Sequence, residues 1–439
     1  MALSADLIIF PIKTNLLLQI LPDYPGYYFR SEMSLHPKIA KLNFNAFLWH
    51  AAFLAFAKNF MDADTIIPAM IIESGGSSVH IGLMTVIILS GSRFAQLFFA
   101  PYISNRPYKK KFLLVGINLR ILALFALGFI LLCLKSQSDQ NLMLWFIFIF
   151  ITLFSLGGAF TNISYTDILG KAVDEEKRKT FFSAKQIIAG VVFIISAFIA
   201  KSILARSAYP INYALLFITG ASLLFIASIG FWLLRESFSS FMGIKGFKDY
   251  MTALKKEIIN NRKMLGYLGF INTQGIIISF LPFVMLYAKQ VFNTQSIDTG
   301  NFLLYKVIGI VVVSMIVLLA ATKVKYRFLM YLNVVLSVFL TAGILMTNDE
   351  FMLKYIFIFS GVAITIYNIT MNGLLLEVSD RSNRALFTGF AGAGHIIPTI
   401  FPLSGGWIID KFGFQPFFII YILIILASLY FIPKIACTK

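Results

Sequence analysis

The amino-acid sequence predicts an all-α integral membrane protein, with twelve transmembrane helices in two pseudo-symmetric bundles of six. Three observations support this fold class. Of the 439 residues, 59% are hydrophobic and 13% are charged, whereas a soluble domain is about 45–50% apolar and about 25% charged. Apolar runs close to the length that crosses a bilayer recur along the chain. One basic, polar segment divides these runs into two equal sets.

The predicted spans follow one another with short polar connections. They define an N-terminal arm (1–41), a first bundle (42–234), a basic linker (235–263), a second bundle (264–433) and a tail (434–439). A helix rises about 1.5 Å per residue, so about 20 apolar residues cross the hydrocarbon core. The runs that meet this length are 44–71, 79–103, 111–134, 142–168, 180–203, 211–234, 264–288, 299–321, 328–346, 353–376, 386–409 and 414–433.

The N-terminal arm does not read as a further span. Residues 5–21 are apolar, but Pro11 and Lys13 interrupt them and the run is too short to cross a bilayer. It lacks the small-residue cleavage site of a signal peptide. Two interpretations remain open: an amphipathic helix at the membrane surface, or translation that begins at Met33.

The distribution of Lys and Arg predicts the orientation. Most of these residues outside the spans fall in the arm, in every second loop and in the linker, so both termini and the linker are expected to be cytoplasmic. The net charge of +17 therefore indicates the orientation of the chain in the membrane and does not indicate nucleic-acid binding, because the charges form short clusters between apolar runs. Cys133 and Cys437 are expected on opposite sides of the membrane, so no disulfide is predicted.

The two sets of spans carry a shared motif. Asp174, Arg178 and Phe181 follow the fourth span, and a second Asp-x3-Arg-x2-Phe motif follows the tenth at Asp380, Arg384 and Phe387. This repetition at equivalent positions indicates an internal duplication. Parallel halves of this kind suit alternating access to a central site.

Two further motifs carry a resemblance to a known family. Residues 101–110, between the second and third spans, correspond to Gly-x-Leu-x-Asp-Arg-x-Gly-Arg-Lys, with Asn105 in place of the aspartate and with Arg106, Lys109 and Lys110 retained. A second copy of the pattern at the end of the eleventh span retains Gly406, Asp410 and Gly413. Over roughly residues 42–433 the chain resembles the major facilitator superfamily, and residues 59–68 look like the first helix of a poorly characterised bacterial branch.

The resemblance implies a secondary transporter and assigns a gating role to the first motif. In the family the motif's aspartate makes charged contacts that help to lock one conformation. Asn105 can hydrogen-bond but cannot form an ion pair, so a gate here is expected to depend on Arg106 and neighbours such as Asp167. Asp167 and Lys185 both lie near the cytoplasmic side and are expected to pair across helices. The repeated loop arginines, Arg178 and Arg384, belong to the same set of gating candidates.

Ionisable residues inside predicted spans mark functional sites, because each costs about 2.5–3.5 kcal/mol on insertion scales. Lys58 and Asp62 lie four residues apart in the first span, so a continuous helix would let them pair. Asp64 would then point about 200° away. Asp62 is the first candidate for a proton-coupling group and Asp64 the second. The alternatives are a structural Lys58–Asp62 pair and an Asp64 that reaches the outer interface.

Other polar residues near mid-depth are candidates for the remaining roles. His395 titrates near neutral pH and is either a proton carrier or a bridge between helices. Arg93 and Arg120 could each bind an anionic substrate or balance Asp62. The resemblance favours a structural role for Arg120, because the third helix lies at the periphery in that family. The substrate-cavity candidates are Lys58, Arg93, Gln274, Lys306 and Asn368.

The combined expectation is a proton-coupled secondary transporter for a small solute, monomeric and placed in the cytoplasmic (inner) membrane. The sequence contains no nucleotide-binding loop, metal-ligand spacing or nucleophile constellation, so no enzyme activity, metal or cofactor is predicted. The mixture of cationic and amide side chains favours an anionic or sugar-like solute. The alternatives are a polytopic enzyme that acts on lipid-linked substrates and a non-transporting receptor with the same fold.

Overall fold

The computed structural model describes residues 37–104, 106–133, 140–173, 175–237, 248–249, 251–252, 255, 261–320, 324–378 and 394–435. Every regular element in these ranges is an α-helix or a short 3-10 segment. The described chain begins with α1 at Pro37, a few residues before the predicted first bundle. The predictions for residues 1–36, including both interpretations of the apolar stretch, lie outside the described residues.

The helices before the linker follow the predicted spans closely, except for a break in the first. They are α1 (Pro37–Lys58), η1 (Asn59–Met61), α2 (Ile66–Glu73), α3 (Ser78–Ser104), α4 (Lys110–Cys133), α5 (Gln140–Ala172), α6 (Glu175–Arg206) and α7 (Ile211–Leu233). This set is called the first group below.

The helices after the linker form the second group. They are α9 (Arg262–Gln274), η2 (Gly275–Ser279), α10 (Phe280–Val291), α11 (Ser296–Leu319), α12 (Tyr326–Leu345), η3 (Glu350–Met352), α13 (Leu353–Val378), α15 (Ile396–Phe412), α16 (Phe414–Ala427), η4 (Ser428–Tyr430) and η5 (Ile432–Lys434).

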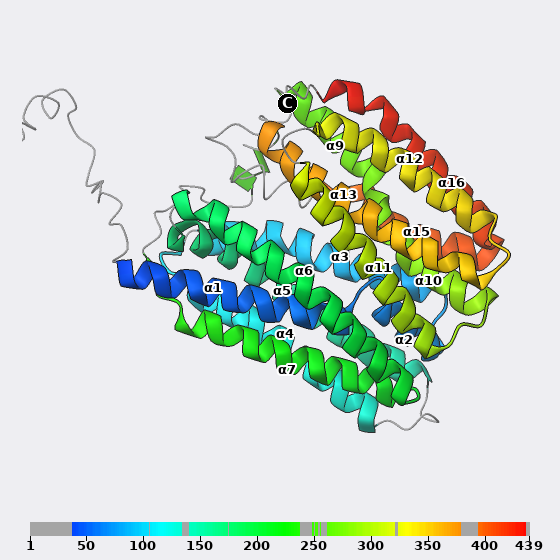
Figure 1. Cartoon of the computed structure of the whole chain (residues 1–439), viewed down its shortest axis with the longest axis horizontal. Coiled ribbons are helices and arrows are strands. Elements are labelled where there is room, and N and C mark those ends of the chain that lie inside the picture. The colour runs from blue at the N-terminus through cyan, green and yellow to red at the C-terminus, as the bar shows by residue number, and fades with distance from the viewer. Residues whose placement is uncertain are drawn as a thin grey trace, which may run out of the picture. The chain divides into compact units, whose positions relative to one another are not determined.

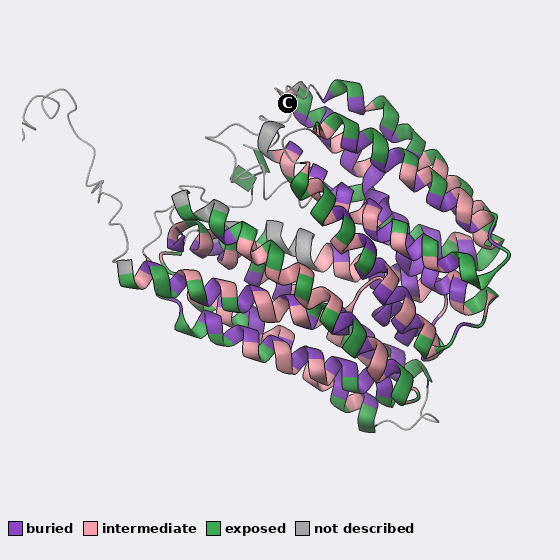
Figure 2. Ribbon diagram, in the orientation of Figure 1, coloured by how far each residue is buried: buried purple, intermediate pink, exposed green. Residues whose placement is uncertain are grey.

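The described part of the chain contains nine helical segments that are long and apolar enough to cross a membrane. The other three predicted spans correspond to the broken α1–α2, to α3 and to α15. In α3, the described stretch Ser78–Gly91 is apolar. Large apolar side chains are also exposed on the outward faces of the helices, including Phe339 at 71% and Leu319 at 78% (Figure 2). Such surfaces need lipid around them, so this is a multi-pass membrane protein.

Within each group the helices lie side by side (Figure 1). In the first group α4 packs against α5 and α7, and α1 packs against α6 and α7. In the second group α13 packs against α11 and α12. Small residues make the closest approaches possible, as is usual between membrane helices. A Cβ atom on Gly361 of α13 would lie only 2.2 Å from the carbonyl oxygen of Lys306 on α11.

The two groups contact each other mainly through α3 with α15 and α6 with α11. We name the two ends of the helices by the linker: α7 ends and α9 begins at the linker end, and the opposite end is the distal end. Three close contacts between the groups lie toward the distal end. Gly406 faces the Ser78 carbonyl, Gly82 faces the Pro402 carbonyl, and Gly300 faces Lys201.

Candidate functional site

The first predicted span is broken at Asp62. The helical geometry of α1 and η1 stops at Met61, and Asp62 is extended, with φ −66° and ψ 123°. Its Oδ1 atom accepts hydrogen bonds from the Thr65 amide (2.9 Å), the Thr65 hydroxyl (2.8 Å) and the Asp64 amide (3.1 Å). Aspartate is a preferred residue in such turns, because its carboxylate can accept hydrogen bonds from backbone amides two and three residues later. Pro68 fits the first turn of α2, where no amide donor is needed.

Lys306 on α11 joins this break to the second group. Its ammonium group lies 2.5 Å from Asp62 Oδ2 and 2.8 Å from Asp64 Oδ2. The Lys306 side chain is only 4% exposed, and both carboxylates are largely buried. Lys306 is ten residues into α11, about 15 Å from the distal end of that helix. With all three groups ionised the cluster carries one net negative charge, which a single proton would neutralise.

The pairing of Lys58 with Asp62 expected from helical spacing is wrong. That spacing brings side chains together only in a continuous helix, and the helix ends between the two residues. The Lys58 side chain is exposed instead, and Asp62 pairs with Lys306. The expected divergence of the two aspartates is wrong for the same reason, because both bind one ammonium group.

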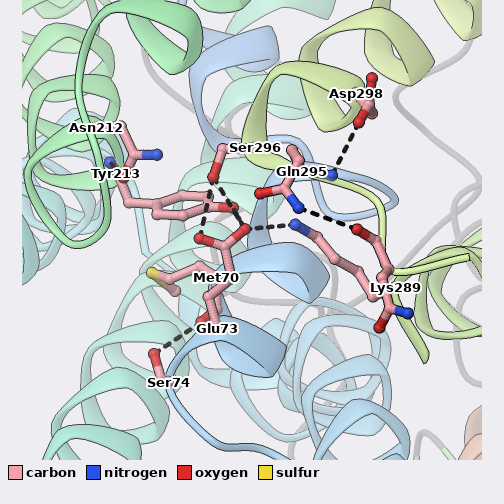
Figure 3. Close-up of polar contacts among 10 residues, drawn as sticks. Met70, Glu73, Ser74, Asn212, Tyr213, Lys289, Gln295, Ser296 and Asp298 are labelled. Carbon is pink, nitrogen blue, oxygen red and sulfur yellow. Dashed lines mark hydrogen bonds and ion pairs between the residues drawn. The ribbon is translucent and has the colours of Figure 1, made fainter.

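A second ion pair between the groups lies at the distal end (Figure 3). The Glu73 carboxylate at the end of α2 lies 2.5 Å from the ammonium of Lys289 on α10. It also accepts hydrogen bonds from the Tyr213 hydroxyl at the start of α7 (2.9 Å) and the Ser296 hydroxyl at the start of α11 (3.1 Å). Sequence reasoning missed this cluster. The available signal was the opposite charge of two residues that close the first and seventh predicted spans at the same end.

At the linker end, the described contacts of Lys109 and Lys110 are with residues of the first group and with Glu236. Lys109 is buried and lies 2.8 Å from Asp167 of α5, which also pairs with Lys171. The Glu236 carboxylate accepts hydrogen bonds from the backbone amides of Lys109 (2.6 Å) and Lys110 (2.8 Å). Burial lowers the pKa of the Lys109 ammonium, and its contact with Asp167 opposes this effect.

Two of the gating candidates make contacts other than the expected ones. Lys185 does not pair with Asp167, and its ammonium lies 5.8 Å from the centre of the Tyr165 ring on α5. Arg106 is exposed, and its guanidinium lies 4.6 Å from the centre of the Tyr102 ring. Asn105 and Arg384 lie outside the described residues, as do the side chains of Arg93 and Arg178.

The second copy of the motif lies at the distal end. Asp410 is exposed and lies 3.4 Å from the neighbouring Lys411. A Cβ atom on Gly406 would lie 2.4 Å from the Ser78 carbonyl, so glycine permits the close approach of α15 to α3. Gly413 has φ +83° and joins α15 to α16 in a backbone conformation that other residues rarely adopt.

The remaining candidates lie in the second group. Gln274 is fully buried and donates hydrogen bonds to Asn333 Oδ1 (2.5 Å) and Ser337 Oγ (2.8 Å) on α12, so its amide already has protein partners. The His395 ring lies 3.3 Å from the Tyr367 hydroxyl and is 8% exposed. Asn368 on α13 is exposed.

A separate apolar groove lies between α12 and α13. Its volume is about 550 Å³, and its lining includes Leu336, Phe339 and Tyr355. Phe339 is also among the most exposed apolar side chains. The lining contains none of the charged residues of the clusters above, and its apolar surface suits lipid tails.

Comparison with known proteins identifies the family. The family model described as Major Facilitator Superfamily matches residues 48–394. No curated protein sequence matches this chain. Among solved structures, a variant of the nucleoside transporter NupG has 13% identity and a TM-score of 0.64, over 90% of this chain and 100% of that one. A D-xylose–proton symporter has 15% identity and a TM-score of 0.63, over 92% and 98%.

A third similar structure is a bacterial homologue of the human lysosomal transporter Spinster, solved inward-facing and unoccupied. It has 10% identity and a TM-score of 0.57, over 91% of this chain and 95% of that one. At these identities the likeness is one of fold.

Proposed function

This chain belongs to the major facilitator superfamily, and from that premise we propose that it is a proton-coupled secondary transporter of a small solute. It works by alternating access, and the Asp62–Asp64–Lys306 cluster is its coupling site. The observation that carries the proposal is the buried Lys306 of the second group, which binds two carboxylates at the helix break of the first group.

The proposed architecture has twelve spans in two bundles, 42–234 and 264–433, joined by the cytoplasmic linker 235–263. The arm 1–41 and the tail 434–439 also lie in the cytoplasm, and the protein is a monomer in the inner membrane. The order of helices in the two groups and the Lys and Arg pattern support this arrangement. The distal end is then the outer side.

The cluster couples protonation to movement of the bundles for an electrostatic reason. A buried carboxylate is stable when a partner balances its charge, and it becomes costly when the partner is removed. If the bundles separate at the outer side, Asp62 and Asp64 lose Lys306. A proton bound by one of the carboxylates then replaces the lost positive charge. Closure returns Lys306 to the carboxylates and favours release of that proton to the cytoplasm.

The pair of Glu73 with Lys289 supports the assignment of this structure to an outer-closed state. It joins α2 to α10 at the outer side and is held further by Tyr213 and Ser296. The corresponding contacts at the linker end, among Lys109, Asp167 and Glu236, all lie within one bundle.

Uptake into proteoliposomes with an inward pH gradient tests this function. Succinate, glucose 6-phosphate and glucose are offered as solutes, and an internal pH-sensitive dye reports proton entry. We expect one of them to accumulate with protons, and we expect both Asp62→Asn and Asp64→Asn to abolish gradient-driven accumulation. Asn at position 62 can still accept the amides of the helix break, so these variants should fold.

Asp349→Asn is the matched control, because Asp349 is an exposed carboxylate that caps a short helix remote from the cluster in sequence. Its uptake should equal that of the unmodified protein. Gradient-driven accumulation that survives in both cluster variants would contradict the coupling site while leaving the fold assignment intact.

A further inference from the structure

Three cationic side chains gather inside the first group, each from a different helix: Lys58 on α1, Arg120 on α4 and Lys185 on α6. The positive charges of Arg120 and Lys185 both act on the Lys58 ammonium. The same two charges act on the ring of His50, about two turns earlier on α1. Arg120 and Lys185 are each ten residues from the linker end of their helices, so both lie about 15 Å deep.

The described residues provide no carboxylate to balance these charges. The described acidic side chains of the first group are engaged elsewhere: Asp62 and Asp64 with Lys306, Glu73 with Lys289, Asp167 with Lys109 and Lys171, and Glu236 with two backbone amides. The Arg120 Nε atom is buried and has no hydrogen-bond partner in the described structure. Three cations without counter-ions at membrane depth are costly unless an anion joins them.

The surroundings of the cluster fit a solute with a ring or a short apolar body. The Arg120 guanidinium lies 4.3 Å from the centre of the Phe154 ring, and Lys185 lies over Tyr165. His50 is fixed by its contact with the Ala227 carbonyl (3.1 Å) and by stacking on Phe231. Fixed aromatic walls with a few convergent charged groups are typical of small-molecule sites.

The cluster is also accessible. Lys58 is exposed, and Arg120 and Lys185 are partly exposed. Lys58 lies inside the first apolar run, at the end of α1. An ammonium group that faced lipid there would cost about 2.5–3.5 kcal/mol, so the exposed surface of Lys58 is expected to face water between the helices. The close contacts between the groups lie toward the distal end. We therefore expect the solute to reach the cluster from the linker end.

We propose that Lys58, Arg120 and Lys185 bind the anionic group of the transported solute, a small organic anion that carries a carboxylate or phosphate group. The identification of this anion as the cargo rests on the proposed transport function, whereas its binding does not. Arg120 supplies a planar donor pair suited to two oxygens of one anionic group. Lys58 and Lys185 supply point charges on either side of it, and Tyr165 contacts the body of the solute.

Binding to the purified full-length protein tests the proposal without any flux. The probes are succinate, glucose 6-phosphate and inorganic phosphate, with glucose as the uncharged control, in buffer of physiological ionic strength to screen surface charge. At least one anion should raise the Tm of the protein in a saturable manner, because a ligand of the folded state stabilises it by mass action. Glucose should not.

Lys58→Gln, Arg120→Gln and Lys185→Gln should each weaken binding of that anion at least tenfold. Lys185→Arg, which keeps the charge, should retain most of the affinity and so separates charge loss from misfolding. Arg120→Lys keeps the charge but loses the planar donor pair, so it should bind more weakly than the unmodified protein and more tightly than Arg120→Gln. Lys354→Gln is the matched control, because Lys354 lies over the Phe351 ring outside the first group. Its affinity should be unchanged.

The proposal is overturned if no anion raises the Tm, if glucose stabilises as well as the anions do, or if Lys354→Gln weakens binding as much as the cluster variants. Anion binding without gradient-driven uptake would uphold this site and remove the transport function. Uptake that is unchanged in all three Gln variants would uphold the transport function and remove this site.

Discussion

At the residue scale, Lys306 and its two carboxylates form the proposed coupling site. The sequence identified Asp62, Asp64 and Lys306 separately, because ionisable residues in apolar runs are conspicuous. It could not identify their contact, because Lys306 and Asp62 are 244 positions apart and belong to different helix groups. The sequence suggested Lys58 as the partner instead, and only the helix break explains why that suggestion fails.

Replacement of Lys306 should destabilise the fold. In Lys306→Gln two buried carboxylates face each other without a counter-ion, and the loss of one partner from a buried ion pair costs about 3–5 kcal/mol. We expect a large fall in the Tm of the purified protein, and recovery of most of it when Asp62→Asn and Asp64→Asn are added. Lys354→Gln should leave the Tm unchanged. A normal Tm in Lys306→Gln alone would show that the pairing contributes nothing to stability.

At the element scale, several span boundaries were predictable to within two residues and the interruption of the first span was not. The predicted 111–134 and 328–346 differ by one or two residues from α4 (Lys110–Cys133) and α12 (Tyr326–Leu345), because bilayer thickness fixes the apolar length. The break at 62–65 lies inside an apolar run. It depends on local hydrogen bonds of Asp62 that hydropathy does not measure.

The close packing of α11 against α13 places Lys306, and a single methyl group should disturb it. In Gly361→Ala the new Cβ would meet the Lys306 carbonyl at 2.2 Å, so the two helices must separate. We expect a lower Tm and weaker proton-coupled uptake. Gly343 of α12 has nothing within 4 Å of its Cβ position, and Gly343→Ala should be neutral or slightly stabilising. Equal effects of the two substitutions would contradict this view of the contact.

At the scale of the whole molecule, two ion-pair sites join the helix groups on one side of mid-depth. The Glu73 cluster closes the distal end, and the Lys306 cluster lies about 15 Å deeper. The order and approximate bounds of the elements were predictable from the sequence. The two ion-pair sites were not, because each joins residues that are more than 200 positions apart.

Loss of the Glu73 contact should open the outer side. Thr299 on α11 is fully buried, so Thr299→Cys in a Cys133→Ser, Cys437→Ser background gives a reporter that should react slowly with a membrane-impermeant maleimide. Adding Glu73→Gln removes the charge that holds Lys289 and should increase the labelling rate several-fold. Adding Asp410→Asn, a change at an exposed carboxylate, should not. Equal labelling rates in all three proteins would argue against a gate at Glu73.

The same reporter provides the most direct test of the coupling site, because it requires no knowledge of the solute. Acidification should protonate Asp62 or Asp64, release Lys306 and favour opening of the outer side. The labelling rate of the Thr299→Cys reporter should therefore rise as the pH falls, after correction for the pH dependence of the thiol itself. In the reporter that also carries Asp62→Asn and Asp64→Asn, the rise of the corrected rate should be largely lost, and only the part that depends on Glu73 should remain. The same rise in both proteins would contradict the coupling site.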